Sequence, residues 1–88
     1  MSQPIAVTNT LAERGSCYGD FSSHAIITQN IKRAMVESPN WGELPDNMKE
    51  SLEMIAHKIG RILNGDPAYV DSWHDISGYA TLIENELS

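Results

Sequence analysis

The sequence contains little cysteine and no long apolar stretch. Its one cysteine, Cys17, cannot form a disulfide within the chain and has no Cys or His nearby at zinc-ligand spacing, which excludes a disulfide scaffold and a zinc ribbon. The only apolar run near the N-terminus, residues 5–7, is far shorter than the roughly 20 residues that cross a bilayer. We therefore expect a soluble, cytoplasmic protein without a targeting segment or a membrane partner.

Basic residues are also scarce. The chain has 6 Lys and Arg against 12 Asp and Glu, which gives a formal net charge of -6. Since positive side chains supply most non-specific affinity for nucleic acids, we expect no duplex nucleic acid as a partner. The 88 residues suffice for one domain, and a core of that size provides little net stability. We therefore expect a partner subunit.

No segment alternates apolar and polar residues as a half-buried strand does, which predicts an all-α fold. The pattern of helix-breaking residues predicts one domain over residues 1–88, a small helical bundle of three long helices and one short N-terminal helix. About ten N-terminal residues are interpreted as either disordered or part of the short helix. The predicted helices span residues 4–13, 20–37, 46–63 and 69–87.

Several residues mark the ends of these helices. Asp20 or Ser22 can cap the second helix, and Pro45 suits the first position of the third. Asn64 and Gly65 tolerate a left-handed ending before Pro67. In the last helix the apolar residues alternate spacings of four and three, which is typical of a packed seam. These residues are Tyr69, Trp73, Ile76, Ala80, Ile83 and Leu87.

Four carboxylates are candidate metal ligands. Glu50 and Glu53 share the face of the third helix that is opposite its apolar stripe, and Asp71 and Asp75 lie one turn apart in the last helix. The short turn between the two helices predicts antiparallel packing. Clustered hard oxygen ligands suit Mg²⁺ or Mn²⁺, which bind phosphate chains. The alternative is that the four acids form the solvated faces of two amphipathic helices.

These acidic faces also carry residues that favour packing. Met54 lies beside Glu50, and the stripe of Asp71 and Asp75 continues through Gly78 and Leu82. A second packed surface in so short a chain indicates either a ligand cleft or an oligomer. We expect a homodimer or a dimer of dimers, with Leu82 buried between subunits.

Long parts of the chain resemble a known family. The similar stretches are LAERG at 11–15, YGDF at 18–21, HA at 24–25, residues 50–65, and DSWHDISGYA at 71–80. They resemble a family of small phage and prophage proteins that is similar to the all-alpha nucleotide pyrophosphatases, the MazG-like superfamily. The resemblance implies a phage-encoded protein of the host cytoplasm and a fold of the MazG-like type.

The resemblance also implies an activity and a set of site residues. In the superfamily, a Glu-x-x-Glu pair and a Glu-x-x-Asp pair on consecutive helices bind Mg²⁺, and a metal-activated water cleaves a nucleoside triphosphate to the monophosphate and pyrophosphate. Glu50 and Glu53 match the first pair and Asp75 the final position, which implies catalytic roles for these three. With Asp71 they form the implied metal site. Ser72 stands at the remaining position of the second pair.

Three further residues are candidates for substrate binding. If the resemblance extends to mechanism, Lys58 and Arg61 contact phosphate oxygens; alternatively they are surface partners of acids. The turn that ends at Asp20 precedes a helix N-terminus, where a nucleotide could approach or where the turn is simply capped. His57 and His74 flank the acidic positions and could assist as donors or proton acceptors near neutral pH, but we interpret both as surface or interface residues, and His24 as a packing residue.

Three functions remain open from the sequence. The first is an Mg²⁺-dependent nucleoside triphosphate pyrophosphohydrolase acting on an NTP or a dNTP. The second is a non-catalytic nucleotide-binding protein, which the serine at position 72 favours. The third is a phage protein that interacts with a host factor, consistent with the acidic composition.

Overall fold

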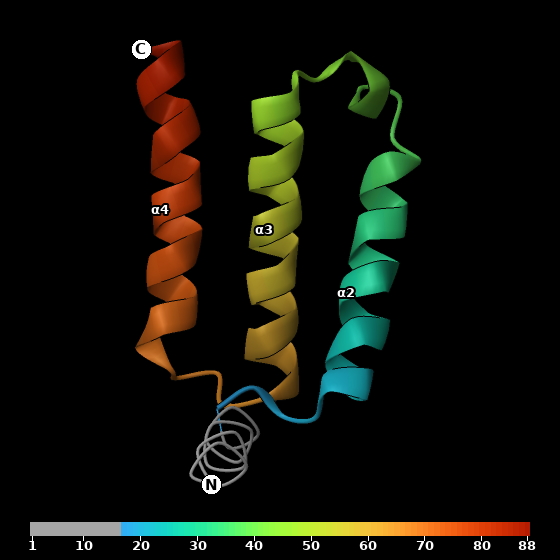
Figure 1. Ribbon diagram of the computed structural model, residues 1–88, viewed down its shortest axis with the longest axis vertical. Coiled ribbons are helices and arrows are strands. Elements are labelled where there is room, and N and C mark those ends of the chain that lie inside the picture. Colours follow the sequence, from blue (N-terminus) through green and yellow to red (C-terminus); the bar gives the residue numbers. More distant parts are fainter. Residues whose placement is uncertain (1–16) are drawn as a thin grey trace, which may run out of the picture.

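The computed structural model describes residues 17–88, which form three long helices joined by short connections (Figure 1). The elements are α2 (Phe21–Val36), the 3-10 helix η1 (Trp41–Glu43), α3 (Asp46–Asn64) and α4 (Val70–Leu87). The described residues contain no strand, so the predicted all-α class and the three long helices are confirmed. The short helix predicted at 4–13 lies outside the described residues.

Helix α2 begins at the predicted cap. The Asp20 carboxylate accepts a hydrogen bond of 3.0 Å from the Ser23 backbone N–H. This bond satisfies one of the N–H groups that have no partner inside the first turn of a helix. Beyond the last turn, the Ser38 hydroxyl donates to the Met35 carbonyl at 2.8 Å. Side chains close to each end thus define where the helix begins and ends.

Helix α3 begins at the predicted residue and ends one residue later than predicted, but its caps differ from those expected. Pro45 is the N-cap and Asp46 the first helical residue. After the helix, Gly65 has φ -129°, so the left-handed ending that the sequence favoured is not adopted. Gly65 is needed for space instead, because a Cβ there would collide with the Cys17 carbonyl and the Tyr18 backbone.

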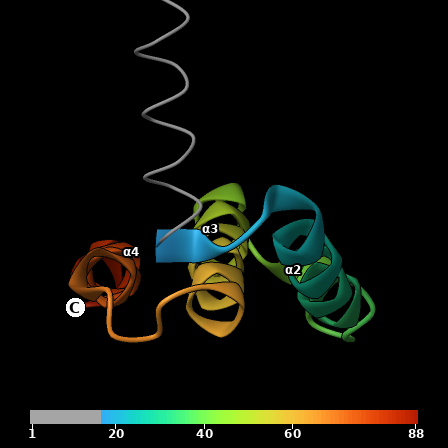
Figure 2. The same cartoon turned by 90° about the horizontal axis from the view of Figure 1, so that it is seen from below.

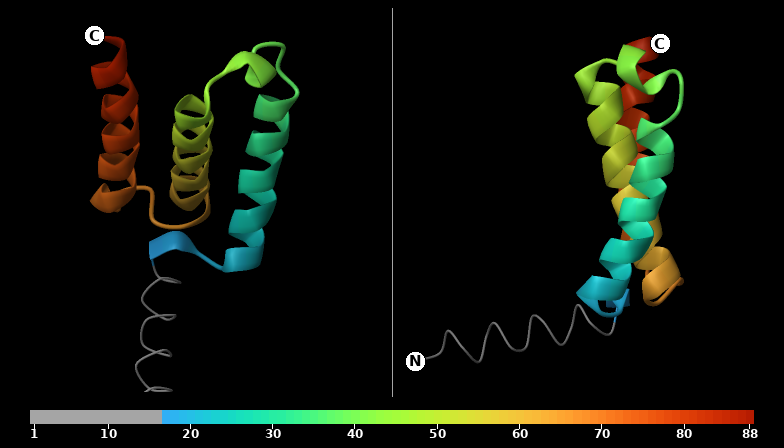
Figure 3. Two further views of the ribbon diagram at one scale, coloured as in Figure 1. Left: turned by 45° about the horizontal axis from the view of Figure 1, so that its top comes forward. Right: turned by 90° about the vertical axis from the view of Figure 1, so that its right-hand side faces the viewer.

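The three helices form a single layer with α3 in the middle (Figures 1 and 2). Helices α2 and α4 pack on opposite flanks of α3, and in the edge-on view the three overlap (Figure 3). Both faces of the layer therefore lack a covering helix within residues 17–88. This differs from a closed bundle. Each short connection places a helix beside its sequence neighbour, and no described segment crosses back over the layer.

The residues buried between the helices are small or polar. Ala56 is the only apolar side chain buried among the described residues. The buried polar residues are His24, Thr28, Ser51, Lys58 and Ser72. Two flanks of α3 pack against α2 and α4. The apolar stripe of α3 therefore lies on a face that no described helix covers, and Leu52 in this stripe is 41% exposed. The apolar seam predicted for α4 is likewise not its buried side, since Trp73 is 54% exposed and Ser72 only 3%.

Candidate functional site

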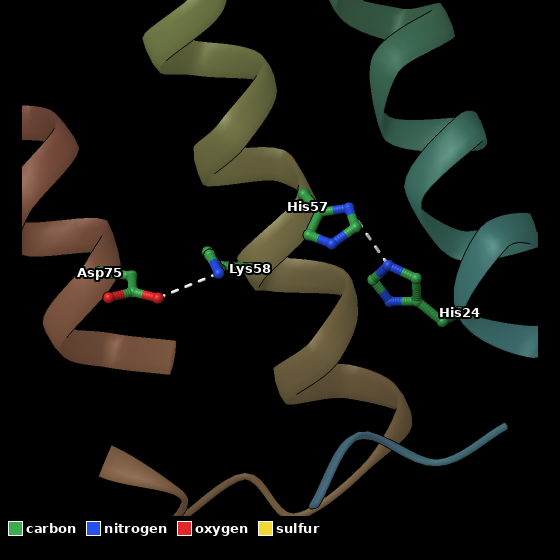
Figure 4. A network of polar contacts seen from close by, with 4 residues as sticks. All are labelled: His24, His57, Lys58 and Asp75. Carbon is green, nitrogen blue, oxygen red and sulfur yellow. Dashed lines mark hydrogen bonds and ion pairs between the residues drawn. The ribbon is translucent and has the colours of Figure 1, made fainter. Parts of the chain in front are cut away.

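An ion pair joins α3 to α4 (Figure 4). The Lys58 Nζ lies 2.9 Å from an Asp75 carboxylate oxygen, and the Lys58 side chain is 10% exposed against 41% for Asp75. The hydrogen bond from Lys58 holds the pKa of Asp75 below its usual value. The structure therefore brings together a residue predicted to bind phosphate and one predicted to bind metal.

Three contacts fix the register between α3 and α4. Asn47 bonds to Glu86, the Ser51 hydroxyl donates to the Tyr79 carbonyl at 2.8 Å, and Lys58 pairs with Asp75. This antiparallel register places Glu53 level with Tyr79, which is one turn, or about 6 Å along the axis, beyond Asp75.

The four predicted metal ligands are spread along this register. Glu50 lies level with Leu82, roughly 10 Å along the axis from the level of Asp75, and Asp71 lies one turn from Asp75 in the opposite direction. Residues 17–88 contain no group of three His, Cys, Asp or Glu side chains placed to hold a metal ion. The metal assignments of these four residues stay predictions.

Position 72 has a structural reason to be small. The resemblance implies a carboxylate there, and Ser72 is buried against α3. A carboxylate buried in this seam would lose hydration unless a cation or several donors compensated it. The neighbouring Asp71 is exposed and does not substitute for it in the seam.

Arg61 and the turn before α2 form a second cluster next to the ion pair. The Arg61 guanidinium lies over the Tyr18 ring, 4.2 Å from its centroid. The Asn64 side-chain amide donates to the Tyr18 and Asp20 carbonyls, both at 2.9 Å. The Asp20 carboxylate caps α2, and the hydrogen bond from the Ser23 backbone lowers the pKa of Asp20. At Asp20 the structure therefore matches the capped-turn interpretation.

Two histidines face each other between α2 and α3 (Figure 4). The His24 Nε2 lies 3.4 Å from the His57 Nδ1 and 3.3 Å from the Thr28 hydroxyl, and the rings are T-shaped with centroids 4.6 Å apart. Burial, followed by the charge of Arg61, lowers the pKa of His57 to about 4. Burial also lowers the pKa of His24. Both rings are therefore neutral at pH 7.

The packing prediction for His24 is confirmed, since it is 5% exposed. The contact of His57 with it was not predicted. A pattern in the sequence could have indicated this contact: Thr28 follows His24 by one turn, and Gly60 follows His57 by three residues. A Cβ at Gly60 would collide with the Thr28 hydroxyl. Glycine at this position lets α2 approach α3 closely.

Positive charge converges on His57. Lys32 from α2 and Lys58 and Arg61 from α3 all act on this ring to lower its pKa. We call Lys32, Lys58 and Arg61 the cationic cluster, and the side of the layer on which Lys58 meets Asp75 the polar face. The cluster holds three of the six basic residues of an acidic chain. The pair of Lys58 with Asp75 is the only ion pair among the described residues, so Lys32 and Arg61 have no carboxylate partner there.

Comparisons with family models, with curated proteins and with solved structures found no match to this chain. Within the part of the chain that the structure describes, no helix has both the length and the apolar character needed to cross a membrane.

Proposed function

We propose that this protein binds a nucleotide and holds its phosphate chain at Arg61, with Lys32 and Lys58 contributing positive charge nearby. The observation that supports the proposal is the placement of Arg61: its guanidinium lies over the Tyr18 ring, 4.2 Å from the centroid, and has no carboxylate partner among residues 17–88 of an acidic chain. Neighbouring cations repel one another, and a bound anion removes that cost. Arg61 suits this role because its planar fork can bind two phosphate oxygens at once.

A binding assay with matched arginine variants tests the proposal. In titration calorimetry against all eight common NTPs and dNTPs, we expect one or more to bind. Arg61→Gln should weaken that binding by roughly ten- to a hundredfold, the value of a charge-assisted hydrogen bond. Arg33→Gln is the control, because Arg33 is exposed on α2 and bonds to Asn30. The proposal is wrong if none of the eight binds, or if the two variants lose the same affinity.

A metal-dependent pyrophosphohydrolase is the second candidate. The observation that favours it is that Glu50 and Glu53 share one side of α3, with Glu53 only one turn from the level of Asp75. One observation favours binding without hydrolysis: Lys58 pairs with Asp75, a carboxylate that the hydrolase would need for its metal.

Pyrophosphate release separates the two candidates. With Mg²⁺ or Mn²⁺ present, the hydrolase converts at least one NTP or dNTP to the monophosphate, and Glu53→Gln abolishes the turnover. If a nucleotide binds but no product forms in the same screen, the remaining function is non-catalytic nucleotide binding. If the protein neither binds nor hydrolyses any of the eight nucleotides, the interaction with a host factor is the remaining hypothesis.

A further inference from the structure

An apolar groove lies between α3 and α4 on the side opposite the polar face. It has a volume of about 310 Å³, and its main lining residues are Leu44, Met48, Leu52, Ile55, Ile83 and Leu87. We call it the α3–α4 groove. The one hydroxyl in its lining, that of Ser51, is already used in the hydrogen bond to the Tyr79 carbonyl. The groove therefore offers almost no polar group to water or to a polar ligand.

The groove belongs to a larger set of uncovered apolar side chains. Nine large hydrophobic residues are exposed in the described part of the chain, while Ala56 is the only apolar one that is buried. They are Phe21, Ile26, Val36, Leu52, Leu63, Val70, Trp73, Leu82 and Leu87. A stable domain needs two layers that enclose an apolar core, and residues 17–88 supply one layer.

We infer that a second copy of this chain covers the α3–α4 groove, so that two layers pack face to face around a shared apolar core. The covering must be present whenever the chain is folded, because the layer has no core of its own. A second copy meets that condition at every concentration at which it folds, whereas a different partner has to be made in step with it.

The area of the face fits such a dimer. The 19 residues of α3 give a length of about 28 Å at 1.5 Å per residue. Two helices whose axes are about 9 Å apart present a face about 18 Å wide, which gives roughly 500 Å² per copy. The pair then buries roughly 1,000 Å², the lower bound for a specific interface. The corrugation of the side chains and any contact from α2 increase this area.

Charge selects this face over the opposite one. A shallow groove on the polar side of α4 is lined by His74, Asp75, Gly78, Tyr79 and Leu82. Covering that groove would bury His74 and the ion-paired Asp75 carboxylate and cost them their hydration, whereas the α3–α4 groove has an almost wholly apolar lining. The interface predicted from the sequence, with Leu82 buried between subunits, used that side, whereas the geometry points to the side that carries Leu52.

The first test uses the unmodified full-length chain. Sedimentation equilibrium should show a dimer at micromolar concentration. The urea midpoint should rise as the protein concentration rises, because unfolding then includes dissociation. A chain that stays monomeric at hundreds of micromolar, with a midpoint independent of concentration, would overturn the inference.

The second test compares two Leu→Glu variants. Leu52→Glu places a carboxylate in the groove and should weaken dimerisation by roughly a hundredfold or more. Leu82→Glu is the matched control on the other side of the seam, where Leu82 is 61% exposed, and it should leave the dimer constant within about threefold. The reverse result would place the interface on the Leu82 side and overturn the inference.

A deletion variant tests whether residues 1–16 of the same chain occupy the groove instead. If residues 1–16 cover the groove of their own chain, the full-length protein is a monomer and deleting those residues makes it associate. That outcome overturns the inference. If a second copy covers the groove, the dimer survives the deletion.

Discussion

At the scale of single residues, Gly60 and Gly78 occupy equivalent places in the interiors of two helices but have opposite surroundings. A Cβ at Gly60 would collide with the Thr28 hydroxyl, whereas nothing lies within 4 Å of a Cβ at Gly78. Gly60→Ala should lower the free energy of unfolding by about 1–3 kcal/mol through overpacking. Gly78→Ala should raise it by about 0.5–1 kcal/mol, because alanine favours a helix.

Urea unfolding of both glycine variants at one protein concentration measures the difference. Equal effects of the same sign would show that α2 and α3 are not as closely packed as described. A destabilising Gly78→Ala would indicate that a neighbour in the assembly packs against Gly78, on the side of Leu82.

The histidine pair predicts a pH dependence of stability. In the unfolded chain His57 titrates near 6.5, and in the fold its pKa is about 4. Between these values the unfolded state therefore binds more protons than the folded state. The contribution of His57 to the free energy of unfolding is fully present above about pH 6.5 and is lost as the pH falls to about 4. The burial of His24 acts in the same direction. Allowing for solvent screening, the loss is about 1–2 kcal/mol.

Urea midpoints measured from pH 8 to pH 4 test this dependence. His57→Gln should flatten the profile between pH 6.5 and 4. His74→Gln, at an exposed position of α4, serves as the control and should leave the slope unchanged. Losses below about pH 4 belong instead to carboxylates such as Asp75, whose pKa is lowered by Lys58. An identical slope in the two variants would exclude His57 as the source.

At the scale of the helices, the start of α2 depends on one side chain. Asp20→Ala removes the oxygen that accepts from the Ser23 N–H and should lower the free energy of unfolding by about 1 kcal/mol. Asp20→Asn keeps a capping oxygen and should change stability by only a few tenths of that amount. Chemical unfolding followed by circular dichroism measures both. If Asn is as destabilising as Ala, the charge of Asp20 matters and not its role as a cap.

Helix positions were largely predictable because local chemistry sets them. Asp20 marks the start of α2, Pro45 lies at the N-cap of α3, and Pro67 prevents α3 from continuing toward α4. The reason for Gly65 was not predictable. It depends on the chain around Cys17, far away in the sequence, which passes directly against it.

At the scale of the whole molecule, α3 differs from its neighbours because it has a helix on each flank (Figure 1). Helices α2 and α4 each have such a neighbour on one side only. We expect native-state hydrogen exchange to be slowest in α3, around Ser51 to Lys58, where buried residues recur on both flanks. Exchange in α2 as slow as in α3 would contradict an open layer with a central helix.

The sequence alone determined the class of the fold and the ends of its helices, because periodicity and capping act within a few residues. It also placed Glu50 and Glu53 on one side of a helix, Asp71 and Asp75 on one side of the next, and Lys58 and Arg61 near both. Only the tertiary structure decided how these sets meet. The antiparallel register of α3 and α4 pairs Lys58 with Asp75, places Glu53 one turn away and buries Ser72. Register depends on which side chains fit between two helices, and no spacing within one helix contains that information.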